Sequence, residues 1–432
     1  MHIRIYNETY QKINYTSHNF TLEVPIVSCN DDNKILLSIV NDGKKIVMVS
    51  HTDNTIEARI WFNQRDTPII LVGYPKDMSN VSILICNSGN RITLWLDISL
   101  VDEDWPLGNV MFDGAICETM VGEWYINDEI AFNMDVKVSK DITDISRFKP
   151  EGHNTGVGDC MPFSHDDTFH LFYLYDRRGH KSKWGLGAHQ WAHISTKDLK
   201  SWEQHPIAIA IDEQYEGSIC TGSVVCHNGV FFAYYAVRMS DGSPARITWA
   251  TSEDCVNFTK SYEYFELSFP YDTASARDPK VIIDENGTAH MFITTSIDIS
   301  GALKGCLAHY SSKDMLIWEE KEPLIVLDIE DQPECSDYFY FKGIYYLIYS
   351  NYGMARYYTS KEPFGPWTSP ENNIVMNPSV RVPKTAIFLD RVITVGFIVD
   401  PPEARYAGYF SFGEMIVDED GTVSFTTPRE YI

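Results

Sequence analysis

The sequence lacks long apolar runs and paired cysteine motifs, and its first residues do not have the pattern of a cleavable leader. No stretch of 18 or so consecutive apolar residues occurs in the 432 residues, which argues against a membrane-spanning helix. The nine cysteines are odd in number and scattered, without a C-x-x-C pair, so neither a zinc site nor a redox pair is indicated. The opening MHIRIYNETYQK has no apolar core followed by a small-residue cleavage site. We therefore expect a cytoplasmic protein with reduced thiols and no membrane partner.

Positive charge is also scarce. Lys and Arg number 35 against 60 Asp and Glu, which gives a formal net charge of −25, and most of the basic residues are scattered. Such a chain repels phosphate backbones, so we expect no nucleic-acid partner. The hydrophobic content of 44%, with 13% aromatic residues, excludes disorder as the main state and supports well-formed cores.

Short β-rich runs recur along the chain, and no 3.6-residue period persists over fifteen residues, which predicts an all-β fold. Within residues 1–138, runs such as KILLSIV and VSILIC alternate with turns such as NDG and NSGN, as in a β-sandwich. The segment RITLWLDISLVDEDWPLG resembles concanavalin-A-like or laminin-G-like sandwiches, which are often carbohydrate-associated. Residues 139–157 are polar, contain Pro and Gly and do not alternate, so we predict a linker there.

An internal repeat occupies the remainder, residues 158–432. Its copies are STKDLKSW (195–202), TSEDCVNF (251–258), SSKDMLIW (311–318) and TSKEPFGPW (359–367). Each copy follows a hairpin of aromatic and β-branched strands around a polar turn, and a fifth, divergent hairpin comes last. Five such units predict a five-bladed β-propeller, whose radial closure protects strand edges.

The residues that recur within the repeat have a structural interpretation. We expect the repeated acidic side chain to cap the turn and the aromatic residue to pack between blades. This interpretation applies to Asp198, Asp254, Asp314 and Trp318.

Three carboxylates at blade beginnings break the repeat. Asp159 lies in VGDCMPF before the first blade, Asp278 in SARDPKVII at the third, and Glu334 in QPECSDYFY at the fourth. Innermost strands line the central funnel of a propeller, so these side chains are expected to meet a ligand there. Three converging carboxylates suit glycoside hydrolysis. A turn-capping Asp159 and a buried structural Glu334 are the plain alternatives.

The segments RDPKV, ECSD and FHLFYLYDRRGHKSKWGLGAHQWAHISTKDLKSW resemble glycoside hydrolase family 32, the β-fructofuranosidases, over roughly residues 155–430. The resemblance implies Asp159 as nucleophile, Asp278 as transition-state stabiliser and Glu334 as acid and base in a retaining mechanism. No cofactor is implied, because acid, nucleophile and stabiliser are all side chains, and the expected substrate is an oligosaccharide or small glycoside. Further implied substrate contacts are Arg277, Trp184, Thr221, Trp191 and Asp176, and Trp191 could equally pack within its blade.

Several positions depart from the family pattern. Gly158 stands where the family has Asn, Leu174 where it has Gln, and Cys220 where it has an aromatic residue. The sandwich also precedes the propeller instead of following it. These departures keep two alternatives open: an arabinofuranosidase-like propeller hydrolase, which could be inverting, and a catalytically silent carbohydrate-binding protein.

Three histidines, His180, His189 and His193, invite a metal interpretation. The last two are four residues apart in strand-like sequence, which separates them by ~13 Å, so we expect no metal site.

The chain's one basic cluster lies in the loop after the first repeated strand. It comprises Arg177, Arg178, His180, Lys181 and Lys183. Charged runs are usually solvated loops. The functional alternative is that these bases bind an anionic group of the substrate, such as a carboxylate or phosphate.

Overall fold

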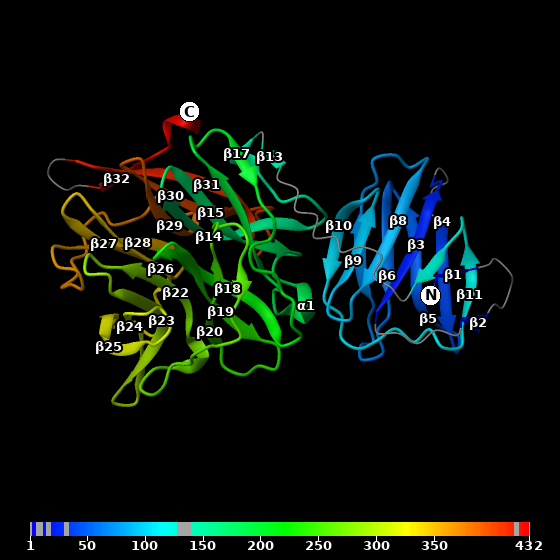
Figure 1. Ribbon diagram of the computed structural model, residues 1–432, viewed down its shortest axis with the longest axis horizontal. Coiled ribbons are helices and arrows are strands. Elements are labelled where there is room, and N and C mark those ends of the chain that lie inside the picture. The colour runs from blue at the N-terminus through cyan, green and yellow to red at the C-terminus, as the bar shows by residue number, and fades with distance from the viewer. Residues whose placement is uncertain are drawn as a thin grey trace.

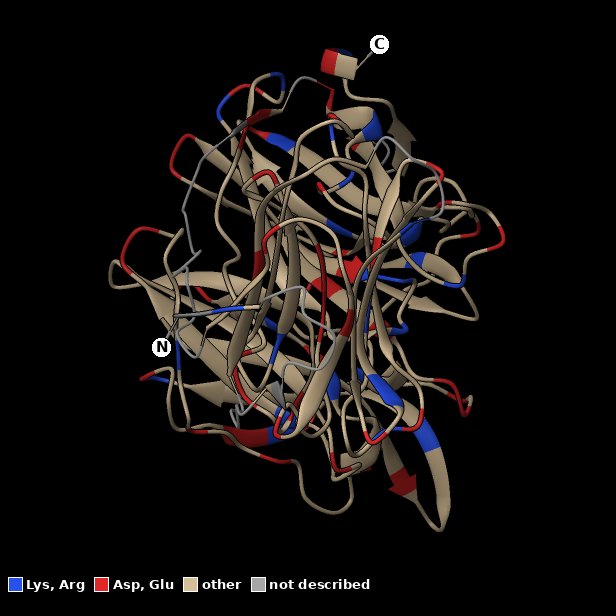
Figure 2. Ribbon diagram, turned by 90° about the vertical axis from the view of Figure 1, so that its right-hand side faces the viewer, with Lys and Arg blue, Asp and Glu red and all other residues tan. Residues whose placement is uncertain are grey.

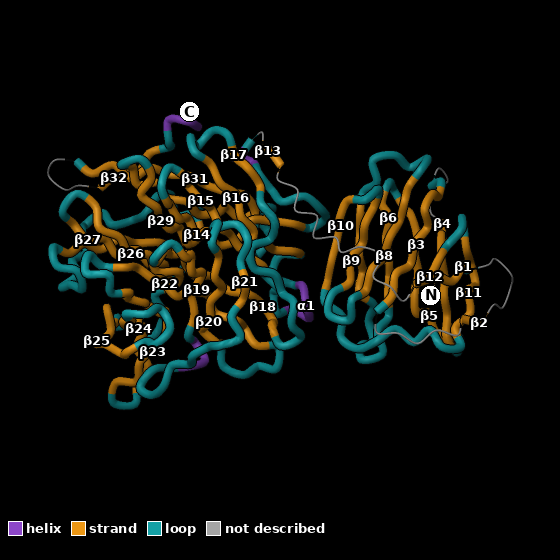
Figure 3. Tube along the Cα trace, viewed as in Figure 1, coloured by secondary structure: helices purple, strands orange, loops and turns teal. Residues whose placement is uncertain are grey.

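The computed structural model describes residues 2–5, 12–13, 19–29, 34–127, 140–142, 144–418 and 423–431. The molecule consists of two β-rich bodies side by side, one formed by the blue-to-cyan N-terminal part and the other by the rest of the chain (Figure 1). Strands dominate both bodies, and helices are few and short (Figure 3). No helix in these described ranges is long and apolar enough to cross a lipid bilayer.

The N-terminal body is a β-sandwich of two six-stranded sheets. The first sheet has the order β1 (His2–Arg4), β12 (Tyr125–Asn127), β3 (Phe20–Val27), β8 (Val81–Asn87), β9 (Ile92–Leu96) and β10 (Ser99–Asp104). The second has the order β2 (Lys12–Ile13), β11 (Ala115–Met120), β4 (Lys34–Asn41), β5 (Lys44–Thr52), β6 (Thr55–Ile60) and β7 (Ile69–Gly73).

One apolar core fills the space between these two sheets. The alternation of β6 turns Ile56, Ala58 and Ile60 inward, as the two-residue period of a strand requires. Phe20 of the other sheet meets Phe112 edge to face, with ring centroids 5.1 Å apart. The predicted sandwich is therefore confirmed.

The second body is a five-bladed β-propeller. Blade 1 has β14 (Thr155–His165), β15 (Thr168–Arg177), β16 (Gln190–Thr196) and β17 (Trp202–Gln204), and β13 (Lys140–Ile142) pairs with β17 at its outer edge. Blade 2 has β18 (Glu216–His227), β19 (Val230–Met239), β20 (Arg246–Ser252) and β21 (Thr259–Lys260). Blade 3 has β22 (Arg277–Ile283), β23 (Ala289–Ile299), β24 (Ala302–Ser312) and β25 (Glu319–Val326).

The last two blades complete the ring. Blade 4 has β26 (Glu334–Phe341), β27 (Ile344–Asn351) and β28 (Met354–Ser360), and blade 5 has β29 (Arg381–Phe388), β30 (Arg391–Val399), β31 (Gly408–Val417) and β32 (Val423–Thr426). The short helices are α1 (Ser182–Gly185), η1 (Ile145–Arg147), η2 (Thr273–Ser275) and η3 (Arg429–Tyr431). Blade 4 has three strands in its sheet instead of the four expected, and two isolated bridges, Arg356 to Ile374 and Thr359 to Thr368, lie along its outer edge.

The propeller closes by contact between its first and last blades. The innermost strands touch in ring order, β14 to β18, β22, β26, β29 and back to β14. A backbone pair between Val157 of β14 and Gly408 of β31 joins blade 1 to blade 5.

Apolar packing between neighbouring blades explains why the blade strands are apolar on both faces. On β15, Phe172 and Leu174 pack against blade 2, whereas Leu171 and Tyr173 pack against blade 5. Each blade interface has its own apolar cluster of this kind. The strand FHLFYLY therefore lacks the polar alternation of a sheet that faces water on one side.

The repeated acidic residues cap turns, as predicted. Oδ1 of Asp198, Asp254 and Asp314 each accepts hydrogen bonds from the backbone amides two and three residues later. These bonds lower the pKa of Asp198 and Asp314. Trp318 packs against the cluster between blades 2 and 3, edge to face with Tyr234. The repeat therefore encodes the scaffold.

Residues 139–157, predicted as a linker, contribute strands to blade 1. Within them β13 pairs with β17, and β14 begins at Thr155. Residues 128–139 lie outside the described residues, and the domain boundaries at 138 and 158 stay a prediction.

The basic loop after β15 contacts the sandwich through a buried ionic network. Arg177 Nε donates to Glu103 Oε1 at 3.0 Å, and Arg178 Nη2 donates to Asp102 Oδ2 at 2.6 Å. Arg177, Asp102 and Glu103 are all at most 2% exposed. Burial raises the pKa of Glu103, but the charges of Arg91 and Arg177 outweigh burial and bring this pKa to about 2. The solvated-loop interpretation is therefore wrong for these two arginines, because the sandwich supplies their counter-charges.

Acidic side chains elsewhere are spread over the molecule rather than gathered on one side (Figure 2).

Replacing Arg177 by alanine is expected to lower the free energy of unfolding by about 3–5 kcal/mol, because Asp102 and Glu103 would stay buried with one counter-charge fewer. Urea denaturation followed by tryptophan fluorescence measures the change. The control Lys321→Ala removes the partner of the exposed Glu319, so a change below about 1 kcal/mol is expected. Equal changes in both variants would contradict the interpretation.

Candidate active site

The innermost strands of all five blades carry the same irregularity. Their pairing with the second strand shifts between Val157 and Cys160, Ile219 and Gly222, Arg277 and Lys280, Glu334 and Asp337, and Arg381 and Lys384. Each shift is a β-bulge that leaves residues out of the ladder and re-aims their side chains. The five bulges therefore offer five corresponding positions around one axis.

Three of the bulges hold non-glycine residues in the left-handed region. Asp278 has φ 52°, Cys335 has φ 50° and Val382 has φ 37°. A left-handed conformation at a non-glycine residue destabilises the protein by about 1–3 kcal/mol, and it persists only where the surrounding structure imposes it. Here the surroundings are a ring of packed blades, which hold the bulged residues against a common cavity.

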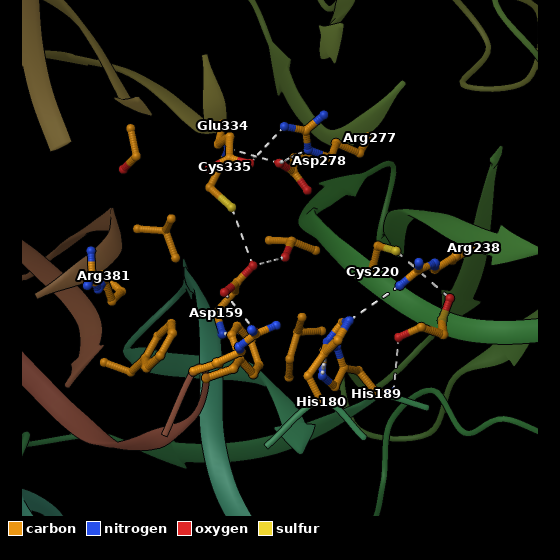
Figure 4. A pocket seen from close by; sticks show the side chains of 18 of the residues that line it. Asp159, His180, His189, Cys220, Arg238, Arg277, Asp278, Glu334, Cys335 and Arg381 are labelled. Carbon is orange, nitrogen blue, oxygen red and sulfur yellow. Dashed lines mark hydrogen bonds and ion pairs between the residues drawn. The ribbon is translucent and has the colours of Figure 1, made fainter. Parts of the chain in front are cut away.

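A cavity of about 1060 Å³ opens at these bulges. Asp159, Asp278 and Glu334 line it together, although they come from blades 1, 3 and 4 (Figure 4). The three carboxylates that break the sequence repeat are therefore neighbours in space.

Asp159 is held by three donors from three other blades. Its Oδ1 accepts from the Tyr406 hydroxyl at 2.8 Å. Its Oδ2 accepts from Thr221 Oγ1 at 2.5 Å and from the Cys335 thiol at 3.4 Å. These bonds fix the carboxylate against rotation.

Asp278 and Glu334 share one arginine. Arg277 Nη2 donates to Glu334 Oε1 at 2.8 Å, and its Nε lies 3.7 Å from Asp278 Oδ2. Asp278 is 4% exposed and also accepts from the Cys335 amide at 2.9 Å. Burial raises the pKa of both carboxyls, and the charge of Arg277 opposes the rise. Residue Cys335 thus touches Asp159 and Asp278 and directly follows Glu334.

A buried charged layer lies among the residues that end the bulges. Lys280 Nζ pairs with Asp337 Oδ1 at 2.6 Å, and Asp337 Oδ2 accepts from the amide and hydroxyl of Thr385. Lys384 Nζ donates to the carbonyl of Gly222 at 3.0 Å. Burial raises the pKa of Asp337, but the charge of Lys280 and the hydrogen bonds lower it below its usual value. This layer ties blades 2 to 5 to one another.

The other residues expected to contact substrate divide into two groups. Arg277 and Thr221 line the cavity, and Thr221 acts on Asp159. Trp191 is fully buried between blades 1 and 2 and donates its indole N–H to the Cys220 carbonyl, so its packing interpretation is correct. Trp184 does not line the cavity and lies beside Lys183.

Asp176 supports the cavity wall from behind instead of lining it. It is 1% exposed and accepts from the amides of Gly179 and His180 and from His189 Nε2 at 2.9 Å. His180 Nδ1 lies 3.3 Å from His189 Nε2. His180 and His189 line the cavity, as does Lys181. Of the basic cluster, only His180 and Lys181 therefore line the cavity.

Several lining residues carried no signal in the sequence. These are Tyr406, Arg238, Arg381 and Arg405, which belong to blades 2 and 5 and to no recognisable motif. Cys335 could have been found, because it stands beside Glu334 in ECSD.

Comparison with known proteins agrees with this geometry. Residues 160–378 match the model of the glycosyl hydrolases family 32 N-terminal domain, which is just over half of the chain. The chain belongs to glycoside hydrolase family 32. The family match contains Asp278 and Glu334 and begins one residue after Asp159.

Relatives in the family and in its structural neighbourhood are distant. Sucrose-6-phosphate hydrolase of Bacillus subtilis is 28% identical over 197 residues, which cover 43% of this chain and 39% of that protein. A family 32 β-fructofuranosidase of Bombyx mori has a TM-score of 0.53 at 21% identity, covering 66% of this chain and 64% of that one. The chain spans about two fifths of the length of the curated relatives it matches.

A family 43 β-xylosidase/α-arabinofuranosidase from a compost microbial metagenome has the same fold. Its TM-score is 0.51 at 16% identity, covering 68% of this chain and 100% of that one. Likeness at this level shows the propeller fold alone.

Proposed function

We propose that this chain is a glycosidase that hydrolyses terminal β-fructofuranosides with retention of anomeric configuration. The observation that carries the proposal is the meeting of Asp159, Asp278 and Glu334, from three blades, at one cavity. Retaining glycosidases need two carboxyl groups with different tasks, a nucleophile and an acid that becomes a base. Membership of family 32 supports the same reaction class.

Asp159 is the nucleophile. Its oxygen attacks the anomeric carbon as the bond to the leaving oxygen breaks, which forms a glycosyl ester on the enzyme. An attacking group has to be held in line with its target, and the donors Tyr406, Thr221 and Cys335 supply that restraint.

Glu334 is the acid and then the base. It gives its proton to the leaving oxygen, later takes a proton from water, and the resulting hydroxide equivalent releases the sugar from Asp159. Burial raises the pKa of this carboxyl, which favours the protonated form needed for the first step.

Asp278 and Arg277 hold the sugar ring. Asp278 is buried at the cavity wall, where a carboxylate stabilises oxocarbenium charge and accepts hydrogen bonds from ring hydroxyls. Arg277 bridges Asp278 and Glu334 and so sets their relative orientation.

Two alternatives have a distinct outcome. The altered Leu174 and Cys220 line the cavity where a sugar would be recognised, and this favours an arabinofuranosidase-type substrate as the second candidate. Product analysis on sucrose, fructo-oligosaccharides and arabinosides separates these substrates. Sugar binding without turnover, unaffected by Glu334→Gln, would instead identify a silent binding protein.

The cavity suits a substrate that carries an anionic group. Four exposed cations line the cavity: Lys181, Arg238, Arg381 and Arg405. Within the described part of the chain none of the four forms an ion pair with a carboxylate, in a protein with a net charge of −25. Cations that gather at a cavity without acidic partners favour a phosphate or carboxylate on the ligand. The names of the curated relatives, sucrose-6-phosphate hydrolases, support a phosphorylated sugar.

Asp159→Asn and Glu334→Gln are each expected to lower kcat on a cleaved fructoside by about a thousandfold or more, because each removes one chemical step while preserving shape. Circular dichroism and thermal unfolding should match the unmodified protein. The control Asp241→Asn changes an exposed carboxylate away from the cavity and should keep full rate. Full activity in either site variant would refute its assigned role.

The pH dependence should show an alkaline limb that belongs to Glu334. The acid step needs the protonated carboxyl, so kcat/KM falls as the pH rises through the pKa of Glu334, which burial raises above the usual value for Glu. Arg277→Gln removes the lowering charge and should move this limb to higher pH. A limb that moves to lower pH in Arg277→Gln would contradict the assignment.

Sucrose 6-phosphate is expected to give a kcat/KM about tenfold or more above that of sucrose, because a charge-assisted hydrogen bond contributes ~1.5–3 kcal/mol. Arg238→Ala and Arg381→Ala should each reduce this preference and leave the rate on sucrose nearly unchanged. The control is Arg429→Ala, at an exposed arginine paired with Glu430. Equal kcat/KM values for the two substrates would exclude an anion-binding role.

A further inference from the structure

The loop before β31 brings a side chain of the last blade to the first carboxylate of the first blade. Tyr406 lies two residues before Gly408, whose backbone pairs with Val157 and closes the propeller ring. Asp159 lies two residues after Val157. The contact that closes the ring therefore also sets Tyr406 beside Asp159.

The approach of this loop depends on two glycines in β14. A Cβ added at Gly158 would lie 2.4 Å from the Tyr406 hydroxyl oxygen and 2.8 Å from the ring carbons Cε1 and Cζ. A Cβ at Gly156 would lie 2.8 Å from the Cβ of Ala407. Neither glycine has a left-handed φ, so space and not conformation requires them.

The Tyr406 hydroxyl bonds to Asp159 twice. It donates to Oδ1 at 2.8 Å and accepts from the Asp159 amide at 3.1 Å. One oxygen thus fixes both the backbone and the carboxylate of the same residue. Burial and the charge of Asp159 raise the pKa of Tyr406 well above its usual value, so the hydroxyl keeps its proton and remains a donor.

The phenol ring is itself held on two sides. His189 stacks on it at 4.9 Å with an interplanar angle of 24°, and Phe397 meets it at 5.2 Å and 66°. His189 is anchored in turn by Asp176 at 2.9 Å. The hydroxyl consequently has a defined position instead of sampling rotamers.

We propose that Tyr406 is a positioning residue which orients the Asp159 carboxylate for attack, and that Gly158 and Tyr406 work as a pair in which the glycine makes room for the phenol. The inference rests on the proposed function, because orientation has a catalytic effect only if Asp159 is the nucleophile. A small misplacement of a reacting group can cost about a hundredfold in rate. The contact that closes the propeller then also orients the Asp159 carboxylate.

The decisive variant is Tyr406→Phe, which keeps the ring and its packing and removes only the hydroxyl. It is expected to lower kcat about 10- to 100-fold, with KM changed less than about threefold and the thermal midpoint preserved. The control Tyr409→Phe, in β31 and away from the cavity lining, should keep the full kcat. A kcat for Tyr406→Phe within twofold of the unmodified protein overturns the proposal.

The pairing is tested by a double-mutant cycle. Gly158→Ala alone should lower kcat strongly, because the added methyl meets the phenol, whereas in a Tyr406→Ala background the same change should cost little more. Additive losses in the cycle overturn the pairing. Should Gly158→Ala not fold, Tyr406→Phe still decides the positioning role.

The Asp159→Asn variant separates a failure of the proposed function from a failure of the positioning role of Tyr406. If Asp159→Asn keeps its activity, the proposed function fails; if it is inactive while Tyr406→Phe is fully active, only the positioning role of Tyr406 fails.

Discussion

The β-bulge in every innermost strand is the constraint on which the rest of the structure depends. A regular strand would pair all its residues and turn them alternately into the two neighbouring blade interfaces, which are apolar. The bulge releases two residues per blade from that alternation, and in every blade at least one released residue lines the cavity: Asp159, Thr221, Asp278, Cys335 or Val382. The backbone of the bulge is alike in all five blades, whereas its side chains differ. The five blades therefore place different functional groups around a single cavity.

The loop after β15 connects the sandwich to that cavity. Its outward side is bound by the sandwich, through Arg177 and Arg178 on Asp102 and Glu103. Its inward side carries His180 and Lys181 to the cavity wall. The sandwich therefore buries the charged side chains on one side of this loop, and the other side of the loop lines the cavity. An N-terminal sandwich can serve the propeller in this way because the contact needs only complementary charge and burial, and the chain order of the two bodies does not matter.

The fold was predictable from the sequence because its signals are local. The repeated Asp and aromatic residue mark each turn, and Asp198, Asp254 and Asp314 cap those turns in the structure. In the third and fourth blades, motifs that break the repeat indicate Asp278 and Glu334. The residues that do not line the cavity were proposed as ligand contacts on other grounds. Trp184 and Trp191 were implied by the family resemblance, and Arg177 and Arg178 by their charge. Trp191 instead packs between two blades, and the two arginines pair with acidic residues of the sandwich.

The sequence by itself determined that the chain is all-β, that five similar units follow a sandwich, and that three carboxylates fall outside the repeat. These properties depend on the spacing and alternation of residues along the chain, and both can be seen in the sequence itself. Only the tertiary structure decided that Tyr406 touches Asp159 across 247 positions and that Glu103 neutralises Arg177. Both contacts join segments far apart in the chain. They form because ring closure and domain packing bring these residues together, and no local sequence pattern indicates that they are neighbours.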